Sequence, residues 1–549
     1  MRFIQPLVFV VAIALLPGCS RQPDADSPLA FAPAATPYVF ANLKPLPKPV
    51  LESWLALAAP YNQVQGEMLA ALRADLGALP PVVQALVPLL EVTQGKLSYA
   101  GFEEMGLRPE GLSALYGIGL VPVLRMELGD ADKFRKLVAD YEHKRGAALP
   151  VEKIEKQDYW RLASPEPETP ALILAIVEQH LVVTVDIGSK GPSLAELLGL
   201  RRPERSVLDS GELAELNDAY DFTPYGTFLL DNRRLAGALS GKDAQTAAAL
   251  LPSPACQAEL AGLAEAVPRT LVGYEQLEAK QLRLNAVVEL REDLTTALQA
   301  VPAPVPGLGG GDRVGLEFGF GAHLDKFADF LQARSAAVAA APFQCEWLRP
   351  FNVAGDSQKL APLYMAAGSI TGMRLTLTEL RWAGVAPESV SGTAVVASPN
   401  PGALIGMVQG FLPQLAGMNL HPGGEPQRLD LGPAGGLLPA ATQAPYIAMS
   451  DKGIGIAVGD DAPQQVVARL GATAPEVPPL FRMAYDGALY AQLLGGMSNM
   501  AALPQGESGT SPSSLDEAMV QVMQGIDRIE MDVLATPRGI EIRERVQLK

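Results

Sequence analysis

The order of apolar segments along this chain is repeated, and the repetition constrains the fold more than any other feature. Five segments of the first half have counterparts in the second half, in the same order. Unrelated apolar patterns would not share that order, so the sequence predicts two homologous repeats. The paired segments are Tyr38–Leu43 with Val314–Gly319, Val123–Leu128 with Thr393–Ser398, Leu174–Val185 with Ile447–Val458, Leu229–Asp231 with Ala484–Asp486, and Leu271–Leu290 with Ile529–Leu548.

Each repeat has the pattern strand, helices, strand, helix, hairpin, helix, hairpin. Apolar and polar residues alternate in segments such as Leu282–Leu290, which is typical of strands with one buried face. Adjacent hairpins favour antiparallel pairing. We therefore expect an α+β fold of two homologous repeats, each a mainly antiparallel sheet packed with helices.

Composition shifts divide the chain further. The segment Val301–Asp312 is rich first in Pro and then in Gly, which indicates a linker, and Ser20–Pro37 is rich in Pro, Ala, Ser and Asp, which indicates a tether. The expected parts are a signal peptide at 1–18, a flexible tether at 19–36, repeat domain 1 at 37–299, a Pro/Gly linker at 300–312 and repeat domain 2 at 313–549.

The N-terminus has the features of an export signal. Arg2 precedes an apolar run, Leu7–Leu16, that is too short to cross a hydrocarbon core of about 30 Å and has the length of a signal-peptide core. The following residues, Leu16-Pro17-Gly18-Cys19, resemble the lipobox of bacterial lipoproteins, although Pro17 stands where Ala, Ser or Thr is commoner. The resemblance implies acylation of Cys19, for example by palmitate. With Ser20 next, it implies an outer-membrane anchor and a protein that faces the periplasm or the cell surface. An ordinary secretory signal that contains a Cys is the alternative.

The net charge limits the kinds of binding partner, and the cysteine content bears on whether a disulfide forms. The formal net charge of −17 repels phosphate backbones and disfavours nucleic acid as a partner. Of the three cysteines, Cys19 is assigned to lipid, which leaves Cys256 and Cys345 as an even pair. In an oxidising compartment such a pair favours a disulfide, with two separate buried thiols as the alternative.

Motifs for catalysis or metal binding are not found. The four histidines lack metal-ligand spacing, and neither a nucleophile elbow nor a phosphate-binding loop is present, so we expect no catalytic residue, metal or cofactor. We expect His143 and His180 at the surface. Asp231 and Asp486 recur at strand-to-helix junctions, where carboxylates cap helices.

Two stretches of the second half, residues 389–424 and 487–506, contain no charged side chain. Their helices are either buried between the domains or line an exposed apolar groove in which Met supplies adaptable contacts. The groove would suit a lipid or an envelope protein. The candidate apolar binding surface comprises Leu404, Met407, Phe411, Leu412, Leu493, Leu494 and Met497.

The chain as a whole resembles duplicated bacterial envelope proteins of unknown function, through the opening Thr36-Pro-Tyr-Val-Phe40 and the duplication. That resemblance implies no activity. We favour a non-catalytic, outer-membrane-anchored periplasmic lipoprotein that binds a lipid or a protein or serves as a scaffold. The alternative is an envelope hydrolase with dispersed Asp and Glu catalytic residues.

Overall fold

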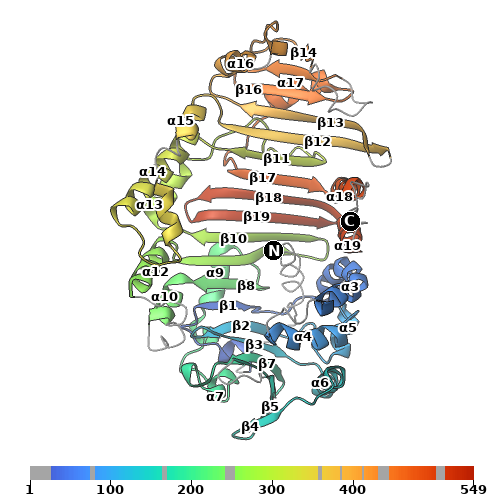
Figure 1. Cartoon of the computed structure of the whole chain (residues 1–549), viewed down its shortest axis with the longest axis vertical. Helices are drawn as coiled ribbons and strands as arrows, with labels where there is room; N and C mark the ends of the chain where they lie inside the picture. Colours follow the sequence, from blue (N-terminus) through green and yellow to red (C-terminus); the bar gives the residue numbers. More distant parts are fainter. Residues whose placement is uncertain are drawn as a thin grey trace. The chain divides into compact units, whose positions relative to one another are not determined.

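A computed structural model gives the fold (Figure 1). The chain divides into two compact units, Met1–Leu284 and Asn285–Lys549. Within the described residues, no helix combines the length and the hydropathy needed to cross a membrane. The expected signal peptide and Cys19 lie outside those residues. The structure describes residues 26–74, 81–162, 170–240, 254–355, 361–383, 386–410, 413–430, 444–501 and 514–549.

The first unit combines a long antiparallel sheet with helices. Its strands pair in the order β4-β5-β6-β7-β3-β2-β1-β8-β9. The strand β10, in which the division between the units falls, follows β9 after a short turn. The elements are η1 Pro28–Phe31, β1 Tyr38–Ala41, α2 Lys48–Ala58, α3 Pro60–Ala74, α4 Pro81–Val92, α5 Tyr99–Glu104, β2 Ser113–Ile118, β3 Val121–Glu127, α6 Ala131–Arg145, β4 Val151–Ile154, β5 Gln157–Leu162, β6 Ala171–Val177, β7 His180–Asp186, η3 Gly188–Lys190, α7 Leu194–Leu197, α8 Val207–Ser210, α9 Glu212–Tyr220, β8 Thr227–Asp231, α10 Asn232–Ser240, α12 Pro254–Ala266, β9 Arg269–Leu277 and β10 Gln281–Glu289.

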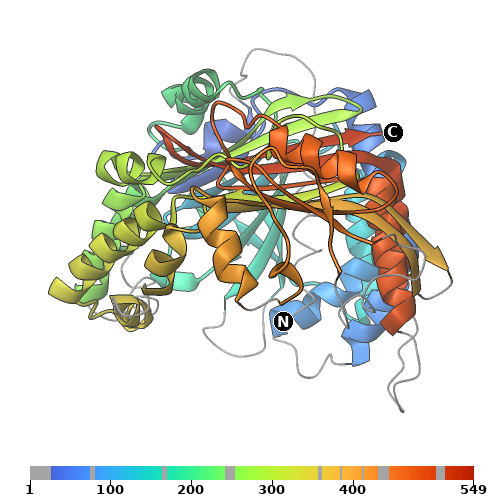
Figure 2. The same cartoon turned by 90° about the horizontal axis from the view of Figure 1, so that it is seen from above.

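The second unit also has an antiparallel sheet, whose strands pair in the order β14-β15-β16-β13-β12-β11-β17-β18-β19. Helices α18 and α19 lie at one end of its strands and α14 and α15 at the other end (Figures 1 and 2). The elements are α13 Glu292–Gln299, β11 Leu316–Gly321, α14 Leu324–Ala340, η4 Arg349–Gly355, α15 Ala361–Ala367, β12 Gly372–Ala383, β13 Ala386–Ala397, α16 Pro401–Gln409, η6 Pro413–Leu415, β14 Gln427–Arg428, β15 Tyr446–Met449, β16 Gly453–Val458, α17 Ala462–Gly471, β17 Phe481–Asp486, α18 Gly487–Ala501, α19 Ser514–Gly525, β18 Ile526–Thr536 and β19 Gly539–Leu548.

The expected α+β class with antiparallel pairing is confirmed. Strand β6 shows why the sequence forms a sheet: its side chains alternate between the two faces, and those at odd positions from Ala171 to Val177 are buried. The even-numbered Leu172 and Leu174 are partly buried on the other face. Both faces of this strand are apolar, so other elements have to pack on both faces to shield them from water.

Helix α6 covers one of these faces. Asp130 caps its N-terminus by accepting hydrogen bonds from the backbone N–H groups of Asp132 and Lys133, at 2.9 and 3.1 Å. Gly146 ends it in the left-handed conformation, with φ 75°. Its apolar stripe repeats at helical spacing and packs into a core cluster; the buried side chains are Phe134, Leu137, Val138 and Tyr141.

The opposite face is covered by residues expected to belong to the tether. Leu29, Phe31 and Ala32 are buried, and Pro33 forms an isolated bridge with Ser206. The part of the expected tether from Ser27 onward is therefore packed against the first unit. Its apolar side chains are buried there. The Pro- and Ala-rich composition gave no sign of this burial.

The expected linker at 300–312 is also largely packed rather than exposed. Val301, Ala303, Val305 and Leu308 are buried, and Val305 and Leu308 pack against Ala397 of β13. Apolar residues at alternate positions of this Pro-rich stretch give it a buried side, while its glycines supply turns with positive φ. The segment covers a face of the second unit's sheet.

The predicted disulfide between Cys256 and Cys345 is confirmed, and both residues are buried. Asp231 caps α10 as expected, since its Oδ1 accepts the backbone N–H of Arg234 at 2.9 Å. Asp486 instead accepts hydrogen bonding from the guanidinium of Arg528 at 2.9 Å.

We predict that Phe31→Ala lowers the free energy of unfolding by about 3–5 kcal/mol, because it opens a cavity under η1. The measurement is urea denaturation followed by circular dichroism. Phe351→Ala is the matched control, since Phe351 is 59% exposed and its loss should change stability by less than about 0.5 kcal/mol. Equal stability of the two variants would show that residues 28–32 do not hold the fold.

Candidate functional site

An apolar pocket of about 360 Å³ lies in the first unit, between α6 and the sheet. Strands β5, β6 and β7 form its wall, and α4 and α6 form its cover. Every lining residue is hydrophobic; Tyr141 alone brings a polar atom. The lining residues are Leu89, Phe134, Leu137, Val138, Tyr141, Leu149, Leu162, Pro170, Leu172, Leu174, Leu181, Val183 and Val185.

The pocket follows from the alternation of the strands. Leu172 and Leu174 of β6 face the same side as Leu181, Val183 and Val185 of β7, because cross-strand partners share a face; Leu174 is paired with Val183. Leu137 of the cover and Leu181 of the wall are buried in the core cluster, whereas Leu174 and Val183 are only partly buried. The pocket is therefore a recess in the core with an accessible side.

An apolar recess of this size can hold hydrocarbon. An apolar cavity of about 150 Å³ stays dry and binds a molecule as large as benzene. Burying a methylene group contributes about 0.8 kcal/mol. The Tyr141 hydroxyl is the one polar side-chain group among the lining residues, so the recess is suited to binding an apolar group.

The other face of the same sheet buries a cation. Arg125 of β3 is fully buried, stacks on Phe31 at 3.7 Å from the ring centroid, and donates from Nη2 to the carbonyl oxygen of Leu198 at 2.5 Å. Burial lowers the pKa of Arg125, with Tyr116 beside it acting in the opposite direction. This cluster ties η1 and the Leu198 turn to the sheet.

His180 belongs to that cluster, so its expected surface position is wrong. It is the first residue of β7, is 3% exposed, and contacts the edge of the Phe31 ring. Burial, followed by the charge of Arg125, lowers its pKa to about 4. A neutral, buried imidazole next to a guanidinium is a structural residue. His143 is exposed on α6, as expected.

A buried ion network crosses the sheet of the second unit. Glu317 of β11 accepts from Nε of Arg374 on β12 at 2.6 Å and from Nε of Arg482 on β17 at 2.8 Å. Arg482 continues to Asp532 of β18 at 2.7 Å and to Glu530 at 3.3 Å. One buried carboxylate thus accepts hydrogen bonds from two guanidinium groups, on the two strands that flank β11.

The network bears on the hydrolase alternative. Desolvation raises the pKa of Glu530, but the hydrogen bond from Arg528 and the charges of Arg482, Arg528 and Arg545 outweigh it, so the pKa lies below its usual value. A general acid needs the opposite shift. Glu530 is therefore suited to pairing with arginine and not to acting as a general acid.

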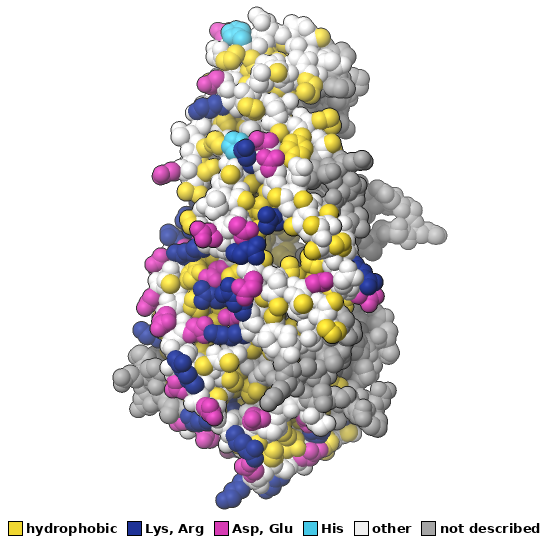
Figure 3. Space-filling view, turned by 90° about the vertical axis from the view of Figure 1, so that its left-hand side faces the viewer, with side chains coloured by type: hydrophobic (Ala, Val, Ile, Leu, Met, Phe, Trp, Pro, Cys, Tyr) yellow, Lys and Arg dark blue, Asp and Glu magenta, His cyan; other side chains and the backbone are white. Residues whose placement is uncertain are grey.

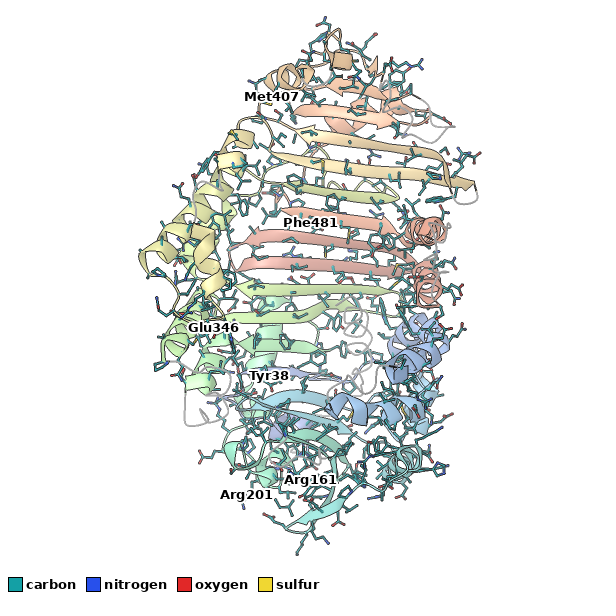
Figure 4. All side chains as sticks on the ribbon, in the orientation of Figure 1. Tyr38, Arg161, Arg201, Glu346, Met407 and Phe481 are labelled. Atoms are coloured by element: carbon teal, nitrogen blue, oxygen red, sulfur yellow. The ribbon has the colours of Figure 1, made fainter. Side chains whose placement is uncertain are left out.

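The candidate apolar surface of the second half is not one exposed face. Leu404 is buried in a core cluster, whereas Met407 on the same helix, α16, is 52% exposed and points away from it (Figure 4). Leu493 and Leu494 are partly buried on α18. Phe411 and Leu412 lie outside the described residues, as does the side chain of Met497.

The charge pattern of the sequence does not reveal the pocket-lining residues, because the helix that covers the pocket is rich in charged side chains. The charged side chains of α6 lie on its outer face, whereas its opposite, apolar face covers the pocket. Its signal was present in the spacing of Phe134, Leu137, Val138 and Tyr141, which predicts one apolar stripe. The strand side of the pocket lies in the predicted hairpin Leu174–Val185.

A metal site and a nucleic-acid interface lack support among the described residues. No group of three or more His, Cys, Asp or Glu side chains within the described ranges could hold a metal ion. On the face shown in Figure 3, basic and acidic side chains are interspersed and do not form a basic field. Comparisons with models of protein families, with curated proteins and with solved structures found no match.

We predict that Glu317→Gln costs about 3–5 kcal/mol of unfolding free energy, because Arg374 and Arg482 stay buried without a carboxylate between them. Urea denaturation measures the loss. The matched control is Glu379→Gln, which breaks an exposed pair with Arg381 and should cost less than about 1 kcal/mol. A Glu317→Gln protein as stable as the control would contradict the structural importance of the network.

Proposed function

We propose that this chain is a bacterial lipoprotein held in the outer membrane by acyl chains on Cys19, facing the periplasm, and that it is a non-catalytic module that binds an apolar ligand. The ligand class is a lipid acyl chain or a similar hydrocarbon. The observation that carries the binding function is the 360 Å³ pocket lined by hydrophobic side chains.

The pocket is larger than the voids that are usual in a protein core. Protein interiors are close-packed, with few voids larger than a water molecule, so an apolar recess of this size leaves its walls without contacts. An acyl chain would restore those contacts. About ten buried methylene groups would contribute about 8 kcal/mol before the costs of association, which limits the affinity to the micromolar range or weaker.

The proposal of a lipid anchor is supported by the sequence at the N-terminus. The segment Leu16–Cys19 at the end of a short apolar run resembles a lipobox, and Cys256 and Cys345 form a disulfide, as proteins exported from the cytoplasm do. Two or three acyl chains bind a membrane far more tightly than one. The net negative charge is consistent with attachment through lipid and not through basic side chains.

We further infer that the two units arose by duplication. Support comes from their strand orders, since β6-β7-β3-β2-β1-β8-β9 in the first unit corresponds to β15-β16-β13-β12-β11-β17-β18 in the second. The five paired sequence segments fall on corresponding strands of these orders. Each unit also has an apolar segment before its first strand, at 27–37 and at 301–312, that covers a sheet face.

The anchor is tested by Cys19→Ser. In a bacterial host fed an alkyne-tagged fatty acid, the unaltered chain should take up the tag and partition into detergent, while Cys19→Ser should do neither, because it lacks the acylated thiol. Cys256→Ser is the control and should keep the tag. Tagging of Cys19→Ser would reject the anchor.

The pocket is tested with a chain that starts at Ser20, stripped of bound lipid and titrated with the fluorescent fatty acid cis-parinaric acid. We predict saturable binding that Leu174→Trp weakens at least tenfold, because the indole fills the pocket. Val151→Trp, on the exposed strand β4 outside the pocket, should bind like the unaltered chain. Circular dichroism verifies that each variant is folded.

Binding by Leu174→Trp at the unaltered affinity would place the fatty acid elsewhere and reject the pocket as the site. An absence of saturable binding by the unaltered chain would reject the acyl-chain ligand. Both outcomes leave the test of the anchor unaffected, so the two parts of the proposal fail separately.

A further inference from the structure

A second pocket, of about 500 Å³, lies in the second unit and is polar. It is formed by the segment before β11 and by one side of α17 and the residues after it. Small residues leave space between its polar groups. The lining residues are Gly310, Asp312, Gln465, Ala468, Arg469, Ala472 and Thr473.

The position of α17 fixes the polar side chains. Val466 and Leu470 are buried against the sheet, and Gly455 of β16 lets them approach, because a Cβ there would lie 2.8 Å from Val466. The neighbouring stripe of the helix, which carries Gln465 and Arg469, then faces the pocket.

Charges of both signs meet in this pocket. The Oδ2 atom of Asp312 accepts a hydrogen bond from Nη1 of Arg469 at 2.6 Å and lies 3.9 Å from Nη2 of Arg374. Asp312 is half exposed, whereas the Arg374 side chain is 1% exposed. A single carboxylate oxygen therefore faces two guanidinium groups and hydrogen-bonds to one of them.

Two sets of buried polar atoms remain unsatisfied beside the pocket. Arg374 uses Nε for Glu317, but its Nη1 and Nη2 have no hydrogen-bond partner among the described residues. The Oε1 atom of Gln465, which lines the pocket, is buried and also has none there. Leaving buried donors and acceptors unpaired destabilises the fold, so such atoms favour a polar ligand group beside them.

The backbone allows the guanidinium of Arg374 to lie beside this segment. Gly307 has φ 71°, and a Cβ at that position would overlap Nη1 of Arg374. Only glycine combines this conformation with this approach. The segment is thereby shaped around a buried cation whose outer nitrogen points toward Asp312.

From this arrangement we propose that the pocket binds a small zwitterion that carries a carboxylate and an ammonium group, of which a free α-amino acid is the simplest. The ligand carboxylate accepts hydrogen bonds from Arg374 Nη2 and Arg469. The ligand ammonium donates to the Asp312 carboxylate and to Gln465 Oε1. The zwitterion replaces the contact between Asp312 and Arg469 with one partner for each charge, and it supplies partners for Arg374 Nη2 and Gln465 Oε1.

Isothermal titration calorimetry tests the proposal on a chain that starts at Ser20 and keeps every described residue. The probes are glycine and alanine, with acetate and ethylamine as ligands that carry only one of the two charges. Glycine or alanine should bind at least tenfold more tightly than either acetate or ethylamine. An absence of amino-acid binding, or acetate binding of equal strength, would overturn the proposal.

Gln465→Leu removes the buried acceptor with little change in volume, and it should weaken amino-acid binding at least tenfold. Gln464→Leu is the matched control, since Gln464 is the exposed neighbour on the same helix, and it should bind like the unaltered chain. Equal binding by both variants would overturn the proposed site. Circular dichroism verifies that Gln465→Leu is folded, and retained binding of cis-parinaric acid by this variant separates the site from the apolar pocket of the first unit.

Discussion

Both faces of each sheet have to be covered, because apolar side chains project to both sides of the central strands. In the first unit α6 covers one face and the segment around Phe31 covers the other. In the second unit Val305, Leu308 and α17 pack on one face. The apolar pocket lies where α6 meets the sheet, and the second pocket lies between α17 and the segment before β11, so both pockets depend on these covering elements.

Much of the architecture could be predicted from the sequence, because period-two alternation and polar turns are local signals. The hairpin Leu174–Val185 became β6 and β7, and the disulfide followed from counting cysteines. The covering segments could not be predicted in the same way. Residues 27–37 lack periodicity, and the short alternation in residues 301–312 is interrupted by Pro and Gly. The burial of both segments depends on sheet faces formed by residues far away in the sequence.

The same distinction holds for the candidate sites. Leu404 was singled out for its uncharged surroundings, yet lack of charge also describes a core residue, and Leu404 is buried. Leu137 lies in a helix full of charge and lines a pocket. Arg374 carries no sequence signal at all, because its environment is made by Glu317, Gly307 and Asp312, which only the folded sheet brings together.

The packing of Phe31 has a consequence for where the first unit resides. Eight residues lie between Cys19 and Pro28, and each of the nine steps of an extended chain covers at most about 3.5 Å, so this segment spans no more than about 32 Å. With acyl chains on Cys19, the first unit would stay within a domain's diameter of the lipid head groups. A hydrocarbon leaving the bilayer would then need only a short passage through water to reach the recess beneath α6.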